Sequence, residues 1–274
     1  MTPEKWLIQP GQTRVIDLED ITELKVGMVG GQIDIVGHDD PGVRIEIHGV
    51  TGKDLRVESS DGKVEIDHPQ LRWDNFLEVF RNFGSGGPKA EISVAVPRAT
   101  ALTLGVVSAS ALVSDLAADA KLNTVSGDLI VDGLEGDLSA NSVSGDLQAR
   151  EVIGSLSTNS VSGDVAVTGE LAAVTVDTVS GATLIDARGP VHRIGVNTVS
   201  GGTTVRLDDG YPANYVVRSV SGRVQVDGVM YSGKAGFGSA VTHTSGDTSG
   251  SFADVRANSV SGAITVVRRA SEEA

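Results

Sequence analysis

The sequence predicts an all-β protein, a parallel β-solenoid with about 18 residues per coil and one short amphipathic helix. Three observations carry this prediction: a recurring tripeptide, a finer nine-residue glycine period, and an unusual composition. Hydrophobic residues make up 40% of the 274 residues, yet aromatic residues make up only 4% and glycines number 34. A core of small aliphatic side chains interrupted by glycine favours thin, regular layers over a bulky globular centre.

The tripeptide Val-Ser-Gly recurs along the chain. Its valines are Val125, Val143, Val161, Val179, Val199, Val220 and Val260. Successive steps are 18, 18, 18, 20, 21 and 40 residues, and a related Val-Ser-Ala at Val107 extends the series backwards. Such self-similarity is typical of stacked repeats, which bury their apolar faces only against their neighbours. The step of 40 predicts one further coil with a degenerate signature between Val220 and Val260.

A nine-residue period lies inside the longer one. Gly127, Gly136 and Gly145 are nine residues apart, and the pattern continues to Gly163. Apolar residues such as Leu129 follow in period-two alternation, which indicates a strand with one buried face. Each unit therefore predicts one strand and one turn, and two units make a coil. We expect the coil to be right-handed, by extension from parallel crossovers.

Glycine and asparagine columns should mark the turns. Glycine accepts the positive φ that a sharp reversal needs, which predicts turn positions at Gly127, Gly145, Gly163, Gly181 and Gly201. Two places before the repeat valines stand Asn123, Asn141, Asn159, Asn197 and Asn258, with Asp177 and Arg218 in the same column. Stacked amides can bond one another, so we interpret this column as a structural ladder in preference to a binding site.

One continuous domain is expected, with two parts. Residues 1–98 should form irregular coils that cap the repeats, and residues 99–274 the regular solenoid with a Gly/Ser-rich excursion near 231–251. The helix is predicted over 71–83 because Trp73, Phe76, Leu77, Phe80 and Phe83 share one helical face. This face is either a lid on the coils or a docking surface for a protein partner.

Catalytic and metal-binding motifs are not evident. Asp128, Asp146 and Asp164 hold the same place in successive repeats, and calcium-binding β-rolls also use nonapeptides. Other coils lack this acid and calcium needs six to eight oxygens, so capping of turns is favoured. The five histidines form no close pair, and no nucleophile or phosphate motif occurs. We expect neither an enzyme nor a cofactor or metal; a polysaccharide-acting β-helix enzyme is the least favoured alternative.

Charge and hydropathy restrict the partners and the location. A net charge of −14 disfavours nucleic acid, whose binding rewards lysine and arginine. The sequence has no run of about 20 apolar residues, so no membrane span is predicted. The start of the chain, MTPEKWLIQPGQTR, lacks the apolar core of a secretion signal, which predicts a cytoplasmic protein.

The repeats resemble a known family. The units TVSGDL and NSVSGDL, with the stretch ISVAVPRATALTLGVVSASALV from Ile92, are similar to the bacterial "putative adhesin" β-strand-repeat family, also called toastrack domains, from about Lys25 to Val267. The resemblance implies a parallel β-solenoid without catalytic residues. It also implies a link, in some relatives, to membrane components of cell-envelope stress signalling.

Two functional hypotheses of different classes remain. The first is a non-enzymatic cytoplasmic scaffold or protein-interaction module, whose regular polar rows contact a protein partner. The second is a surface adhesin or carbohydrate-binding rod. Homo-oligomers are compatible with either, because flat sides and strand edges both permit stacking of copies.

Overall fold

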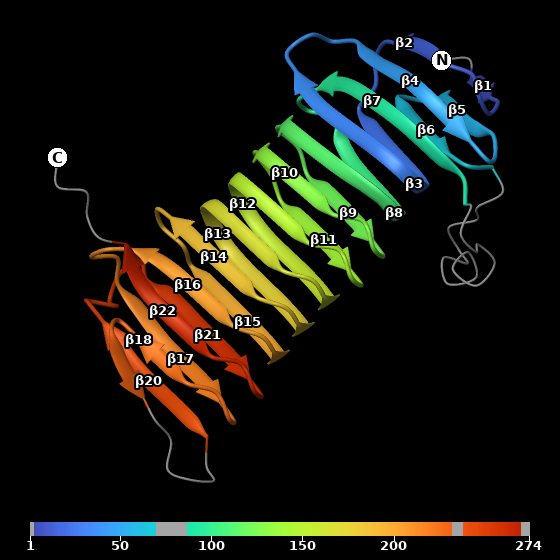
Figure 1. The fold of residues 1–274 in the computed structure, drawn as a ribbon. Helices are drawn as coiled ribbons and strands as arrows, with labels where there is room; N and C mark the ends of the chain where they lie inside the picture. Colours follow the sequence, from blue (N-terminus) through green and yellow to red (C-terminus); the bar gives the residue numbers. More distant parts are fainter. Residues whose placement is uncertain (1–2, 70–86, 232–237, 270–274) are drawn as a thin grey trace. The chain divides into compact units, whose positions relative to one another are not determined.

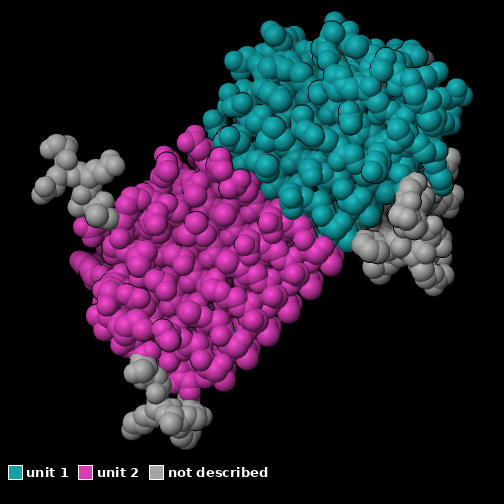
Figure 2. Space-filling view, viewed as in Figure 1, with its two compact units in different colours: residues 1–136 teal, residues 137–274 magenta. Residues whose placement is uncertain are grey.

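The computed structural model describes residues 3–69, 87–231 and 238–269, and all regular elements in these ranges are β-strands (Figure 1). The chain divides into two compact units, residues 1–136 and residues 137–274 (Figure 2). No helix long and apolar enough to cross a bilayer occurs in these described ranges. The predicted division into residues 1–98 and 99–274 has a different boundary and remains a prediction.

Unit 1 contains ten described strands. They are β1 (Glu4–Ile8), β2 (Arg14–Leu18), β3 (Glu23–His38), β4 (Val43–Thr51), β5 (Leu55–Ser60), β6 (Lys63–Asp67), β7 (Lys89–Pro97), β8 (Ala101–Leu116), β9 (Ala120–Thr124) and β10 (Leu129–Leu134). The long strands β3 and β8 pair in parallel along both of their halves. The C-terminal half of β3 also pairs with β7, β7 pairs with β4, and β4 pairs with β2. The N-terminal half of β3 pairs with β6, β6 pairs with β5, and β5 pairs with β1.

Unit 2 contains twelve described strands. They are β11 (Leu138–Ser142), β12 (Leu147–Ser162), β13 (Val165–Ser180), β14 (Thr183–Arg188), β15 (Arg193–Ser200), β16 (Thr203–Asp208), β17 (Ala213–Ser219), β18 (Val224–Val226), β19 (Val229–Tyr231), β20 (Ser239–Ser245), β21 (Ala253–Ser259) and β22 (Ile264–Arg269). Leu138 is the register partner of Leu156, and Leu156 is the register partner of Val174. These first parallel pairings therefore have the same 18-residue step as the Val-Ser-Gly motif. The next pairing joins Val174 to Ile194 and follows the longer step between Val179 and Val199.

The last two strands of unit 2 lie inside the ladder. Strand β21 pairs in parallel with β15 on one side and with β17 on the other. Strand β22 lies in the same way between β16 and β18. The parallel-paired strands are stacked like the rungs of a ladder, and the order of these rungs is β15–β21–β17. The prediction of a degenerate coil between Val220 and Val260 is therefore wrong. The intervening residues instead supply β19 and β20, which pair antiparallel with β18 and β17.

The predicted fold class is wrong for this chain. A parallel β-solenoid with about 18 residues per coil and one short helix requires parallel pairing throughout. Six strand pairs of the described residues are antiparallel: β1–β5, β2–β4, β4–β7, β5–β6, β17–β20 and β18–β19. No described residue lies in a helix, and the helix predicted over 71–83 falls outside the described residues. Side chains alternate between the two faces of the sheet in parallel and antiparallel strands alike, so the alternation in the sequence could not predict strand direction.

The core of unit 2 is a column of stacked side chains. Leu156, Val174, Ile194 and Val255 occupy successive rungs, and each is at most 2% exposed. Tyr215 ends this column, fully buried, where its ring stacks on His243 of the edge strand β20. Each fully buried aliphatic side chain contributes about 1.5–3 kcal/mol before conformational entropy is subtracted.

Glycines form a second column at the reversal of each rung. A Cβ on Gly181 would lie 2.1 Å from the carbonyl oxygen of Gly163, and one on Gly201 would lie 1.9 Å from that of Gly181. Gly262 has the same relation to Gly201, at 1.7 Å. Successive rungs approach so closely here that no side chain fits.

Adjacent glycines at 201 and 202 provide a matched test of this packing. Gly201→Ala should lower the free energy of unfolding by about 2–4 kcal/mol, because a backbone atom rather than a flexible side chain occupies the Cβ position. Gly202→Ala has open space around its Cβ and should change stability by less than about 1 kcal/mol. Urea unfolding followed by circular dichroism measures both. Equal losses for the two variants would contradict the packing described here.

Candidate interaction surface

Six exposed valines form an unbroken row in unit 2. In the order of the rungs they are Val143, Val161, Val179, Val199, Val260 and Val220. Five are 47–50% exposed and Val220 is 67% exposed. Backbone bonds fix the row: the Ser162 N–H donates to the Val143 carbonyl at 2.8 Å, and that of Ser221 donates to the Val260 carbonyl at 2.9 Å.

These valines point outward because of the period-two alternation of the strand. Each lies two residues after an outward column position such as Asn159, so both side chains leave the same side of the backbone. From the sequence these valines were predicted only as repeat markers, and their exposure was not predicted. The spacing from asparagine to valine was the available signal. In unit 1 the equivalent Val125 is only 5% exposed.

The neighbouring column is a hydrogen-bonded ladder. The Asn159 amide nitrogen donates to the Asn141 side-chain oxygen at 2.9 Å, and Asn197 donates to the Asp177 carboxylate at 2.7 Å. Asn258 in turn donates to Asn197 at 2.9 Å. Among the predicted ladder positions, Asn123 lies on β9 of unit 1, and its register partner on β8 is Gly105.

Hydroxyl and carboxylate groups near the turns are turned toward the backbone. The hydroxyls of Ser221 and Ser261 donate to valine carbonyls of the adjoining rung, both at 3.1 Å. The Asp146 carboxylate accepts the Asp164 N–H at 2.8 Å, and the Asp164 carboxylate accepts the Ala182 N–H at 2.7 Å. These polar groups are therefore engaged within the protein.

A buried hydroxyl before each of several repeat valines closes the turn. Ser142 accepts a bond from the Gly145 N–H at 2.9 Å and donates to the Gly145 carbonyl at 2.7 Å. Ser259 accepts the Gly262 N–H at 2.7 Å, and Thr124 performs the same function for Gly127 in unit 1. These residues were not predicted from the sequence, although they recur at a fixed position in the motif.

The valine row and the adjoining column, from Asn141 to Arg218 in rung order, are called here the valine–asparagine face. Its methyl groups are exposed, whereas much of its polar side-chain capacity is satisfied internally. An exposed contiguous apolar patch of this kind is typical of interaction sites.

Asp177 interrupts an otherwise amide-based column. An ionised carboxylate only accepts hydrogen bonds, so it cannot donate to Asn159, its register partner on β12. Asp177→Asn adds a donor and should raise the free energy of unfolding by about 0.5–1 kcal/mol. Urea unfolding of this variant should be compared with Glu170→Gln, which removes an exposed charge of β13 outside the column. Stabilisation of equal size in both variants would assign the effect to net charge.

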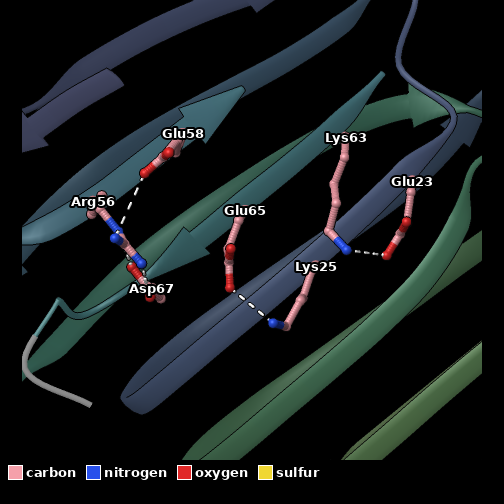
Figure 3. A network of polar contacts seen from close by, with 7 residues as sticks. All are labelled: Glu23, Lys25, Arg56, Glu58, Lys63, Glu65 and Asp67. Atoms are coloured by element: carbon pink, nitrogen blue, oxygen red, sulfur yellow. Dashed lines mark hydrogen bonds and ion pairs between the residues drawn. The ribbon is translucent and has the colours of Figure 1, made fainter. Parts of the chain in front are cut away.

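Unit 1 carries a different surface, a group of cross-strand ion pairs on β3, β5 and β6 (Figure 3). Lys63 contacts Glu23 at 2.6 Å, and Lys25 contacts Glu65 at 2.9 Å. Both pairs join register partners on β3 and β6. These pairs are half-exposed, so each contributes at most about 1 kcal/mol to stability.

The Arg56–Asp67 pair of this group is more buried. Arg56 donates from Nε at 2.7 Å and from Nη2 at 2.5 Å to the two oxygens of Asp67, which is 3% exposed. This bidentate hydrogen bond to Asp67 raises the pKa of Arg56 above its ordinary value. The pair neutralises a carboxylate at the buried end of β6.

His68 follows Asp67 and is completely buried. Its Nδ1 lies 3.0 Å from the Asp54 carbonyl oxygen, so Nδ1 must donate and Nε2 of the neutral ring carries no proton. Burial lowers the pKa of His68, because the imidazolium would lose its hydration. The folded chain therefore binds a proton on His68 less readily than the unfolded chain does.

The free energy of unfolding should depend on pH through His68. Its contribution is complete above the unfolded pKa of about 6.5 and is lost as pH falls through the lower folded pKa. His68→Leu should flatten this decline below about pH 6.5, whereas His48→Leu, at an exposed position, should retain it. Urea unfolding at a series of pH values measures the difference. An unchanged decline in His68→Leu would contradict the assignment.

A second charged cluster, in unit 2, fixes the end of β22. Asp186 of β14 contacts Arg206 at 3.2 Å and also pairs with Arg269, which contacts Asp208 at 2.6 Å. Arg268 lies over the ring of Tyr215, with its guanidinium carbon 5.6 Å from the ring centre. Burial raises the pKa of Tyr215, which keeps the phenol neutral. These contacts join the end of β22 to β14, β16 and β17.

The other predicted site residues lie in different places. Trp73, Phe76, Leu77, Phe80 and Phe83, the predicted docking face, fall outside the described residues. Gly127 takes the turn position in unit 1, and Gly145, Gly163, Gly181 and Gly201 form the glycine column of unit 2. Within the described ranges, no group of three or more His, Cys, Asp or Glu side chains is placed to hold a metal ion.

Comparisons with known proteins agree with an all-β protein of this kind. The family model described as Toastrack DUF4097 matches residues 21–267. The chain belongs to the toastrack family, a family defined by domains of unknown function. No curated protein matches the chain.

Several solved structures are similar at low sequence identity. A "putative lipid binding protein" from Parabacteroides distasonis is 17% identical, with 94% of this chain and 98% of that chain covered and a TM-score of 0.50. A "putative adhesin" from the same species is 12% identical, covering 94% and 98% with a TM-score of 0.42. Another from Bacteroides fragilis is 14% identical, covering 95% and 100% with a TM-score of 0.39. The similarity to the first of these structures, with a TM-score of 0.50, concerns the fold alone.

Proposed function

We propose that this toastrack protein is a non-enzymatic protein-interaction module and that the valine–asparagine face binds its protein partner. The observation that carries the proposal is the row of six half-exposed valines beside a column of hydrogen-bonded amides. Burial of these methyl groups against a partner would provide the main free energy of binding, at about 25 cal/mol per Å² of apolar surface.

The chemistry of the face favours a protein over a carbohydrate. Sugars are recognised through hydroxyl groups, which need free donors and acceptors at the surface. Here the Asn159 and Asn258 amides donate along the column, and the Ser221 and Ser261 hydroxyls donate to backbone carbonyls. The methyl groups that remain accessible suit the apolar side chains of a protein interface.

The acidic side chains of the turns support a non-catalytic protein. General acid–base chemistry requires carboxyl groups that can reach a substrate proton. The carboxylates of Asp146 and Asp164 instead accept backbone N–H groups of the next rung. Their geometry serves the fold.

The proposal extends to the setting in which the protein acts. We place it in the cytoplasm and link it to cell-envelope stress signalling; membership of the toastrack family supports the second point. Cell fractionation tests the location, and recovery of the protein outside the cell would favour a surface adhesin instead.

Two lysines on the valine row test the proposed contact surface. Val161→Lys with Val199→Lys leaves one valine between the two new charges, and Val15→Lys is the matched control at an equally exposed valine of unit 1. The chain is cross-linked in its native cells, and co-purified proteins are identified by mass spectrometry. A protein lost from the double variant but retained by Val15→Lys supports the proposal. Identical partners and identical cross-links between copies of the chain for all three forms would contradict it, provided that thermal unfolding shows the variants to be folded.

A further inference from the structure

We propose that the partner of the valine–asparagine face is a second copy of the same chain, related by a two-fold axis that lies in the interface parallel to the strands, between β15 and β21. This inference rests on the proposed function, since it names the occupant of the same face. An axis of this orientation reverses the order of the rungs but keeps each column opposite itself. On β13, β15, β21 and β17, valines therefore meet valines and the asparagine column meets its own copy, whereas β12 lies opposite β20 of the second copy.

Net charge favours this face as the point of self-contact. Each copy carries −14, so most surfaces of two copies repel each other. The column from Asn141 to Arg218 contains one acid, Asp177, and one base, Arg218, and it is otherwise uncharged. Two copies can approach here without net repulsion.

The placement of these two charges is self-complementary. Asp177 lies on β13 and Arg218 on β17, at the two ends of the rung series β13–β15–β21–β17. An axis midway between β15 and β21 brings Asp177 of each copy opposite Arg218 of the other. Arg218 is exposed, and no ion pair joins it to any residue in the described part of the chain. The two-fold axis therefore creates two equivalent ion pairs.

The next outward column fits the same axis. Gly195 on β15 would face Arg256 of the second copy, and Gly195 has no atom nearer than 3.9 Å to the position of a Cβ. The smallest residue of the column thus lies opposite the longest. Thr175 would face Val216 in the same way. In the valine row, Val199 meets Val260 of the second copy.

Reciprocal charge reversal tests the proposal. Asp177→Arg and Arg218→Asp each place like charges opposite one another and should weaken dimerisation by about tenfold or more. The double variant exchanges the charges, restores both ion pairs, and should return the dimer constant to within about threefold of wild type. Sedimentation equilibrium over a range of protein concentrations measures the mass, because an interface of this small width predicts a dimer that forms at higher concentrations.

Matched controls separate the interface from net charge. Glu170→Arg and Arg188→Asp make the same charge changes on β13 and β14, at register partners outside the face, and should leave dimerisation unchanged. A wild-type chain that is monomeric at every concentration, or a dimer indifferent to both single reversals, would overturn the proposal. If the chain is monomeric while Val161→Lys with Val199→Lys still loses a cellular partner, the proposed function stands and the second copy is excluded.

Discussion

The close approach of successive rungs at their turns is the constraint on which unit 2 depends. Where Gly181 and Gly201 reverse the chain, the carbonyl oxygen of the preceding rung occupies the position that a Cβ would need. Backbone hydrogen bonds can then join the rungs directly through the turn. Because this contact permits no lateral slip, every column of side chains on either side of it is held in register.

The same register produces both the core and the proposed interaction surface. Alternate residues of a strand leave opposite sides of the backbone, so the stacking that buries Val174 and Ile194 also aligns Val179 and Val199 outside. Hydroxyl groups such as that of Ser142 close the turn from within. The surface row is therefore a direct consequence of the buried one, and its residues can vary in chemistry without loss of the register.

Unit 1 achieves its strand pairing by different means. Its antiparallel strands β5 and β6 place Arg56 opposite Asp67, and the parallel pair β3 and β6 places Lys25 opposite Glu65. Opposite charges directly across the β3–β6 ladder favour its register, whereas a slip of this pair by two residues would place Glu23 opposite Glu65. This surface is charged but internally neutralised, in contrast to the uncharged methyl row of unit 2. The two units thus offer partners very different chemistry.

The sequence alone determined the strand periodicity, the turn glycines and the amide column, because these signals depend on residues close together in the chain. The period-two alternation from Asn159 to Val161 also indicates that the Val161 side chain is exposed. Strand direction and rung order were decided only in the tertiary structure. Val260 lies between Val199 and Val220 because β21 pairs with two strands that precede it in sequence. Because the repeats are similar, each repeat strand could pair equally well with several others, and the motif does not specify which. Backbone pairing between strands far apart in sequence decides this order. It therefore also fixes the distance between Asp177 and Arg218.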